Sequence, residues 1–329
     1  MSHRLKVAIV GAGIAGLQIA RNLEATCDVQ VFEKSRGLGG RMSTRRADGY
    51  EFDHGAQYFT AHGAGFQQFL DRHLKSGNVA QWMPRMAALG ATDEQPPFWN
   101  TPRYVAVPGM SSLCKAMAEN LQIHRATRIA QITRADGQWR LTTETGGACG
   151  FFDWVISSAP VEQSAKLLPD EFAGHDDLQS ARMQGCYSLM LGFENPKPLE
   201  WDAATVHGSP LAWIACNSSK PSRSGKLSIL CQSRNDWAET HMEDDPAFVR
   251  DMLLSAFGKV TGMQETGAAY VSVHKWRFAK VETPTASPFL LDSANRLAAA
   301  GDWCGGGRVE AAFDSATALS VAIKEYISN

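Results

Sequence analysis

The chain has 329 residues, of which 44% are hydrophobic and 20% charged, and its formal net charge is −2. These values are typical of a globular protein with one large domain or two. They provide no long-range attraction to nucleic acid or to an anionic membrane. No run of 18 consecutive apolar residues is present, so we expect no membrane-spanning helix.

Cysteine and histidine usage argues against a metal site or a disulfide framework. The seven cysteines are scattered without C-x-x-C spacing, and the nine histidines show no H-E-x-x-H pattern. The first strand begins directly after MSHRLK, which leaves no room for a signal peptide. We therefore expect a cytoplasmic protein without a bound metal.

The clearest unit comes first along the chain. Residues 5–10 predict a buried strand, residues 17–25 a helix and residues 27–34 a second strand. The sequence GAGIAG, residues 11–16, follows the first strand and matches G-x-G-x-x-G. This order of strand, turn, helix and strand is the βαβ unit of a dinucleotide-binding fold.

Each glycine of this motif has its own physical task. Gly11 makes the tight turn, Gly13 lets the backbone approach a pyrophosphate, and Gly16 lets the helix pack closely on the strand. The free N–H groups and the dipole at the start of the helix attract phosphate. Glu33, at the end of the second strand, can accept hydrogen bonds from ribose hydroxyls. The cofactor-binding residues predicted here are Gly11, Ala12, Gly13, Ile14, Ala15, Gly16 and Glu33.

The segment from Lys34 to Arg46 favours FAD over NAD. It contains five basic residues and three glycines, and no acidic residue. Glycines let backbone N–H groups crowd a phosphate, and Arg41 can neutralise its charge. A solvated basic loop is the alternative interpretation. A NAD-dependent dehydrogenase has no use for a second phosphate-facing loop, whereas a cofactor with a flavin beyond its pyrophosphate does.

The rest of the chain first continues with mixed elements and then changes character. We predict a helix at 64–75, a loop with an edge strand at 84–103 and a helix with a serine N-cap at 108–121. A hairpin at 124–146, with its turn at Asp136-Gly137, and a buried strand at 151–160 follow. Between about 164 and 288, strand-like runs surround one helix at 246–258, which indicates an antiparallel sheet. A strand at 296–302 and a final helix follow.

In this order, the motifs resemble the flavoprotein superfamily of amine oxidases, protoporphyrinogen oxidases and phytoene desaturases, and more narrowly the bacterial renalases. The resemblance is carried by KSRGLGGRMSTRR, DHGAQYFTA, RYVAVPGMSSL, SPLAWIACNSSKP, HKWRFA and AGDWCGGGRVE. It implies an α/β fold: a Rossmann-like FAD-binding domain of the p-hydroxybenzoate hydroxylase/amine oxidase type with an inserted β-rich (α+β) substrate domain. It assigns residues 1–75, 104–163 and 289–329 to the FAD-binding domain, and residues 76–103 and 164–288 to the substrate domain.

The resemblance also implies noncovalent FAD, because Cys304 does not match the position of covalent flavin attachment in some amine oxidases. The resemblance places Arg41 at the phosphates and residues 54–58 beside the isoalloxazine ring. It also places the backbone of Ile129 at the adenine and Asp302 at the ribityl chain or the phosphate. The final helix would direct its dipole at the flavin N1–C2=O edge. The residues thus added to the cofactor site are Lys34, Gly39, Gly40, Arg41, His54, Gly55, Ala56, Gln57, Tyr58, Ile129, Gly301, Asp302, Arg308, Val309 and Glu310.

One departure from the family pattern concerns the start of the final helix. Relatives usually read R-V-E-G-A after the glycines, whereas this chain reads R-V-E-A-A, with Ala311 in the place of the glycine. A methyl group at this position could crowd the flavin edge or the helix start.

Hydride transfer to flavin N5 needs no protein base, which agrees with a site rich in aromatic residues, glycines and backbone groups. The candidate catalytic residues are Gln57, Tyr58, His274, Trp276 and Arg103, although Tyr58 could serve core packing and His274 a structural hydrogen bond. The resemblance implies substrates that are isomers of NAD(P)H reduced at the 2- or 6-position, with oxygen as acceptor and hydrogen peroxide as product. The expected partners are this small-molecule dinucleotide and O2, with no nucleic acid or membrane, and the oligomeric state stays open. A flavin amine oxidase acting on a small amine and a non-catalytic flavin-binding redox protein are the alternatives.

Overall fold

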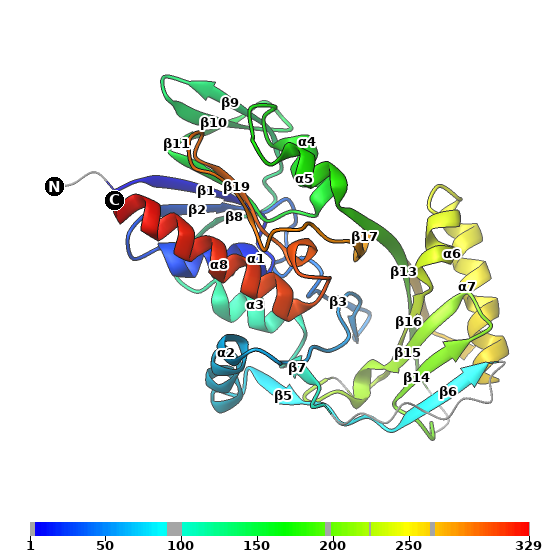
Figure 1. Ribbon diagram of the computed structural model, residues 1–329. Coiled ribbons are helices and arrows are strands. Elements are labelled where there is room, and N and C mark those ends of the chain that lie inside the picture. Colours follow the sequence, from blue (N-terminus) through cyan, green and yellow to red (C-terminus); the bar gives the residue numbers. More distant parts are fainter. Residues whose placement is uncertain (1–3, 91–100, 195–198, 224, 264–266, 329) are drawn as a thin grey trace.

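The central element of the fold is a six-stranded sheet, seen in a computed structural model that describes residues 4–90, 101–194, 199–223, 225–263 and 267–328 (Figure 1). Its strand order is β18-β19-β12-β1-β2-β8. The five strands from β19 to β8 are parallel and β18 is antiparallel to β19. The bounds are β1 (Lys6–Val10), β2 (Asp28–Phe32), β8 (Gln122–His124), β12 (Trp154–Ser157), β18 (Leu290–Asp292) and β19 (Leu297–Ala299).

Alternation along β1 explains what covers each face of this sheet. Val7 and Ile9 belong to one buried cluster, together with residues of α1 (Ile14–Leu23), α3 (Ser111–Met117) and α8 (Val309–Ser328). Ala8 points to the other face, where the core includes Trp139 and Leu141 of a three-stranded antiparallel sheet. That sheet consists of β9 (Ile129–Ala135), β10 (Gln138–Thr143) and β11 (Ala148–Phe152). Figure 1 shows these two layers on opposite sides of the parallel sheet.

A second six-stranded sheet lies beside this three-layered body, with the strand order β17-β13-β16-β15-β14-β6. It is antiparallel except between β14 and β6. Its strands are β6 (Met86–Gly90), β13 (Arg182–Phe193), β14 (Ala203–His207), β15 (Leu211–Cys216), β16 (Leu227–Ser233) and β17 (Tyr270–Thr283). The helices α6 (Asn235–Thr240) and α7 (Pro246–Thr261) cover its outer face (Figure 1).

The inner face of the second sheet is the one that matters for the site. Tyr187 and Leu189 of β13 pack in the cluster that contains α7, so the intervening Ser188 points to the other face. There the Ser188 hydroxyl donates a 2.8 Å hydrogen bond to the carbonyl of His54. The second sheet therefore presents one face to the loop that follows β4 (Tyr50–Asp53).

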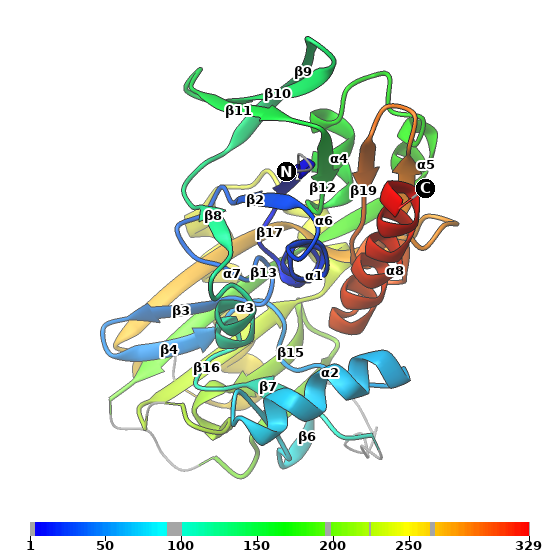
Figure 2. The same cartoon turned by 90° about the vertical axis from the view of Figure 1, so that its left-hand side faces the viewer.

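Short elements complete the fold (Figure 2). They are β3 (Thr44–Ala47), α2 (Ala64–Lys75), β5 (Val79–Gln81), β7 (Tyr104–Ala106), α4 (Val161–Leu167), α5 (His175–Ser180) and two 3-10 turns, η1 (Asn217–Ser219) and η3 (Asp302–Cys304). No helix in the described part of the chain is long and apolar enough to cross a membrane.

The fold class predicted from the sequence is confirmed: a Rossmann-like dinucleotide-binding layer is combined with a β-rich part. The predicted domain boundaries stay a prediction. The expected edge strand within 84–103 is β6, and residues 91–100 lie outside the described part.

Two local predictions were wrong. The residue that caps α3 is Met110 and no side chain caps it, because the backbone turn from Gly109 to Ser112 supplies the hydrogen bond. The strand predicted at 151–160 is divided at Asp153, where the chain passes from the three-stranded sheet to the parallel sheet.

Candidate cofactor and active site

The first glycine turn has the geometry that its sequence predicts. Gly11 has φ +110°, a conformation that L side chains rarely adopt, and a Cβ atom there would lie 2.6 Å from Ser158 Oγ. A Cβ atom at Gly16 would lie 2.0 Å from the carbonyl oxygen of Gly11. Both positions therefore require glycine, one for the turn and one for the close packing of α1 on the loop.

The second glycine turn lies directly against the first. The Gly39 N–H donates a 2.9 Å hydrogen bond to the Ala12 carbonyl, and Gly13 and Gly39 form a parallel bridge. A Cβ atom at Gly40 would lie 3.6 Å from Gly13 Cα, so the backbones of the two turns lie close together with no side chain between them at these glycines. Gly13 also begins α1 without a side-chain cap, which leaves the first N–H groups of the helix available to a ligand. This arrangement fits an anionic pyrophosphate.

Glu33 is placed where the ribose-binding residue is expected. Its side chain is buried, Oε2 accepts a 2.9 Å hydrogen bond from Ala12 N, and Oε1 accepts one of 2.7 Å from Ser35 N. Each oxygen keeps a lone pair for a hydroxyl donor. Ile129 is buried at the start of β9, close in sequence to Thr127, whose N–H donates to the Glu33 carbonyl. By contrast, Lys34 is exposed and donates to Gln163 Oε1.

Arg41 and Asp302 meet although 261 residues separate them in sequence. Two hydrogen bonds of 2.6 Å each join the guanidinium to the carboxylate, whose side chain is 8% exposed. Arg41 also donates to the carbonyl of Ala279 on β17, and its side chain stays 29% exposed. The pair therefore joins the second glycine turn to the η3 turn, and part of the guanidinium stays accessible to a phosphate.

Three predicted residues form an aromatic group on the inner face of the second sheet. His54 stacks on Trp276 with ring centroids 5.3 Å apart and meets His274 edge-on at 4.9 Å. Trp276 Nε1 also donates a 2.7 Å hydrogen bond to the His54 carbonyl. Burial, together with the neighbouring His274 and Arg45, lowers the pKa of His54 to about 4. The pKa of His274 is lowered as well, by burial and by Arg45, so both rings are mainly neutral at pH 7.

Tyr58 and Arg103 form a second group with two tryptophans that the sequence analysis did not select. The Arg103 guanidinium lies 5.2 Å from the centre of the Tyr58 ring. Trp82 and Trp213 lie 6.4 and 5.9 Å from the same ring. The His54 group therefore lies at one end of the segment of residues 54–58 and this group at the other.

The side chain of Gln57 makes its hydrogen bonds within the protein. Its amide nitrogen donates to the carbonyls of Asp53 and Gly55, at 2.5 and 3.0 Å, and its oxygen accepts from Lys220 Nζ at 3.3 Å. The amide thus stabilises its own loop. Sequence reasoning missed Lys220, although SPLAWIACNSSKP contains it, because sequence alone does not distinguish a buried lysine from an exposed one.

The start of the C-terminal helix α8 is tied to the rest of the fold by Glu310. Glu310 is buried, and its Oε1 accepts from the N–H groups of His62 and Gly63, at 2.9 and 2.5 Å, so it joins α8 to the start of α2. Arg308 is exposed and Val309 half-buried at the helix start. The methyl group of Ala311 lies against the glycine turn: a Cβ atom at Gly305 would be 3.0 Å from it.

The Gly301 backbone is extended and its N–H donates to Ser315 Oγ. Cys304 is buried, and burial raises the pKa of its thiol. No cluster of metal-binding side chains occurs among the residues that the structure describes.

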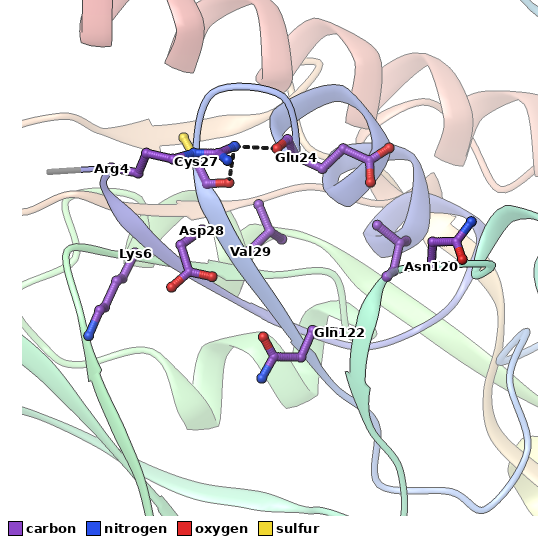
Figure 3. A pocket seen from close by; sticks show the side chains of 9 residues that line it. Arg4, Lys6, Glu24, Cys27, Asp28, Val29, Asn120 and Gln122 are labelled. Carbon is purple, nitrogen blue, oxygen red and sulfur yellow. Dashed lines mark hydrogen bonds between the residues drawn. The ribbon is translucent and has the colours of Figure 1, made fainter. Parts of the chain in front are cut away.

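A depression of about 580 Å³ lies at the opposite end of the parallel sheet (Figure 3). Its lining combines charged residues, among them Arg4, Lys6 and Asp28 at the amino ends of β1 and β2, with apolar ones such as Val29 and Leu121. Ligands of open parallel sheets bind at the carboxyl ends of the strands, where the glycine turns are. We therefore place the cofactor site at the glycine turns and not in this depression.

Fold and site together define a dinucleotide-binding flavoprotein with a β-rich second part. The chain belongs to the family of flavin-containing amine oxidoreductases, whose model matches residues 81–324, and residues 9–73 match an NAD(P)-binding Rossmann-like domain. This membership supports an oxidoreductase with a flavin cofactor. The narrower resemblance to renalases is not among these findings.

Solved structures with similar folds share little sequence with this chain. A protein assigned provisionally as a protoporphyrinogen oxidase, from Exiguobacterium sp. 255-15, matches with a TM-score of 0.78 at 13% identity over 100% of both chains. Cyclohexylamine oxidase from Brevibacterium oxydans IH-35A matches with a TM-score of 0.74 at 13% identity, over 99% of this chain and 100% of that one. These two matches show the fold alone.

A curated relative matches only locally. The 4,4′-diapophytoene desaturase of Staphylococcus aureus (strain Newman) is 32% identical over 78 residues, which are 20% of this chain and 16% of the relative. The match therefore spans about a sixth of that relative's length.

Proposed function

We propose that this protein is an FAD-dependent oxidase that converts 2- and 6-dihydro-NAD(P) to NAD(P)⁺. FAD, held noncovalently, would supply the two-electron acceptor for the substrate's hydride at N5, with oxygen as the final acceptor and hydrogen peroxide as the product. The substrate class comes from the renalase resemblance, and the reaction type is supported by the ionisable groups of the site.

The chain's own residues would each hold one part of the cofactor. The facing glycine turns and the N-terminus of α1 suit the pyrophosphate, and Glu33 suits the ribose. Arg41 and Asp302 suit the phosphate and ribityl side. The segment of residues 54–58, held against the second sheet by Ser188 and Trp276, would lie beside the ring.

The single observation that carries the reaction type is the state of the ionisable groups next to residues 54–58. His54 and His274 have lowered pKa values, and the Asp53 carboxylate is occupied by Lys220 and Arg223. His54, His274 and Asp53 are therefore weak bases that would not hold a substrate proton at neutral pH. Hydride transfer from a dihydropyridine needs no such base, so this environment supports it.

Positive charge near residues 54–58 favours an anionic substrate over an ammonium ion. Arg45 donates to Ser272 on the inner face of the second sheet, and Arg103 lies over Tyr58. The Arg45 guanidinium beside the site attracts a dinucleotide and repels a protonated amine.

The test is anaerobic mixing of the oxidised holoprotein with 6-dihydro-NAD, with ordinary NADH and with a panel of amines, while flavin absorbance is recorded. We expect fast bleaching by 6-dihydro-NAD only. Fast bleaching by an amine but not by the isomer would contradict the proposal, and so would an absence of bleaching by all three.

A flavin amine oxidase is the second candidate, and one observation favours it. Tyr58, Trp82 and Trp213 gather beside residues 54–58, which is the kind of aromatic surface on which an apolar amine can lie. Membership of the family of flavin-containing amine oxidoreductases points in the same direction. The amine arm of the experiment above decides between the two candidates.

A further inference from the structure

The segment that starts at η1 attaches the second sheet to the segment expected at the flavin. Asn217 Nδ2 donates a 2.9 Å hydrogen bond to the Glu51 carbonyl, and its Oδ1 accepts one of 3.2 Å from Asp53 N. Lys220 Nζ lies 3.3 Å from Asp53 Oδ2 and 3.3 Å from Gln57 Oε1. Lys220 therefore binds both ends of the segment from Asp53 to Gln57.

Arg223 adds a second cation to the same carboxylate. Its Nη2 and Nε lie 2.7 and 3.2 Å from Asp53 Oδ2, and the side chains of Asp53, Lys220 and Arg223 are all 0% exposed. One carboxylate cannot neutralise two cations, so the cluster keeps a net charge of about +1 away from solvent. Burial would raise the pKa of Asp53, but the charges of Lys220 and Arg223 outweigh it and hold that pKa below its usual range.

The excess charge makes Lys220 the group that gives up its proton first. Burial and the charge of Arg223, only partly opposed by Asp53, lower the pKa of Lys220 to about 8. Arginine stays protonated under these conditions. The other groups that face Lys220 do not lose a proton before it does. The ring of Trp82, 5.4 Å away, carries no ionisable group, and burial raises the pKa of the Cys216 thiol.

Stability alone gives little reason for such a cluster. A buried ion pair usually contributes little net stability, and an unbalanced cluster contributes less. We propose that Lys220 is a positioning residue of the flavin site: it joins Asp53 to Gln57 across the His54–Ala56 turn and holds one uncompensated positive charge beside that turn. The inference rests on the flavin cofactor and on the predicted place of residues 54–58, and not on the substrate.

The charge has a direct consequence for flavin chemistry. Two-electron reduction gathers negative charge at the N1–C2=O edge of the ring, so a fixed positive charge nearby stabilises the reduced form more than the oxidised form.

Lys220→Met keeps the length of the side chain and leaves a balanced Asp53–Arg223 pair, so we expect it to fold. Lys220→Arg keeps the charge. Lys226→Met is the matched control, because Lys226 is 45% exposed and pairs with Glu194.

The test is the midpoint potential of the bound flavin, measured by reductive titration against a reference dye at pH 7. For Lys220→Met we expect reduced FAD to bind about tenfold more weakly relative to oxidised FAD, which corresponds to a potential about 30 mV lower. Lys220→Arg and Lys226→Met should keep the wild-type potential. An unchanged potential in Lys220→Met, or an equal fall in Lys226→Met, would overturn the inference.

A second measurement does not depend on the folding of the methionine variant. We expect the flavin absorbance of the wild-type holoprotein to change with an apparent pKa near 8 between pH 7 and 9.5, and this transition to be absent in Lys220→Arg. A wild type without the transition, or a transition that persists in Lys220→Arg, would overturn the inference. Neither readout uses a dihydronicotinamide or an amine. A failure of the proposed substrate can therefore be distinguished from a failure of this inference.

Discussion

Arg41 and Asp302 form a doubly hydrogen-bonded ion pair that joins the second glycine turn to the start of the C-terminal segment. Each residue was expected to contact FAD by itself, and the fold makes them partners. Their side chains are 29% and 8% exposed, so the pair lies at the border between core and cofactor site. Removal of either side chain leaves a partly buried charge without its counter-ion.

Arg41→Ala and Asp302→Ala should each weaken FAD binding about tenfold or more, because a charge-assisted bidentate interaction is lost. Isothermal titration of the apoprotein with FAD measures the effect. Arg85→Ala is the matched control, since Arg85 makes a similar pair with Asp202 but is 61% exposed on the second sheet. Equal losses in all three variants would mean that the Arg41 pair has no special link to the cofactor.

Glu33→Ala should reduce FAD retention during purification. The substitution removes the expected ribose acceptor and also leaves Ala12 N and Ser35 N without their present partner. Glu24→Ala, at the exposed end of α1, serves as the control. The ribose assignment fails if Glu33→Ala retains FAD at the wild-type ratio of flavin to protein.

Gly55→Ala should destabilise the protein by about 3 kcal/mol, because the new Cβ atom would lie 1.9 Å from the Arg41 carbonyl oxygen. The neighbouring Ala56 N–H donates to the same oxygen, so the two segments cannot separate without losing that hydrogen bond. At Gly65, in α2, a Cβ atom would meet nothing within 4 Å. Gly65→Ala should therefore be neutral or slightly stabilising in urea unfolding. Similar unfolding midpoints for the two variants would contradict the packing argument.

His54 should make stability fall as the pH is lowered from about 6.5 to about 4. Its pKa is about 4 in the folded protein and about 6.5 in the unfolded chain, so the unfolded chain binds more protons in this interval. The difference amounts to about 3 kcal/mol, present above pH 6.5 and lost progressively below it. Unfolding of His54→Phe, which keeps a ring on Trp276, should depend less on pH than unfolding of the wild type. The control His62→Phe, at an exposed position, should keep the wild-type slope.

Ala311→Gly, which restores the residue usual in relatives, should lower stability by up to about 1 kcal/mol, because glycine in a helix costs backbone entropy. The methyl group at this position already faces Gly305, where no side chain competes for the space. FAD affinity should stay the same. A marked gain in affinity would show that the methyl group crowds the cofactor.

Sequence by itself determined the βαβ unit and the two glycine turns. Their signals are local: each glycine is required by a turn or a close approach within a few residues, and apolar periodicity identifies the strands and helices around them. Strand-like runs between about 164 and 288 also indicated a second, antiparallel sheet, although only one helix was predicted there and the structure has α5, α6 and α7.

Tertiary structure decided which charged and polar side chains meet. Asp53 and Lys220 are 167 residues apart in sequence, and Arg41 and Asp302 are 261 apart. No local pattern encodes such pairs, since they depend on how two sheets pack. Because of the same packing, the Gln57 amide accepts a hydrogen bond from Lys220 and donates to two carbonyls of its own loop. Its place in the sequence had suggested a flavin contact. Burial then set the protonation of His54 and Lys220, because desolvation acts only after the fold has enclosed a side chain.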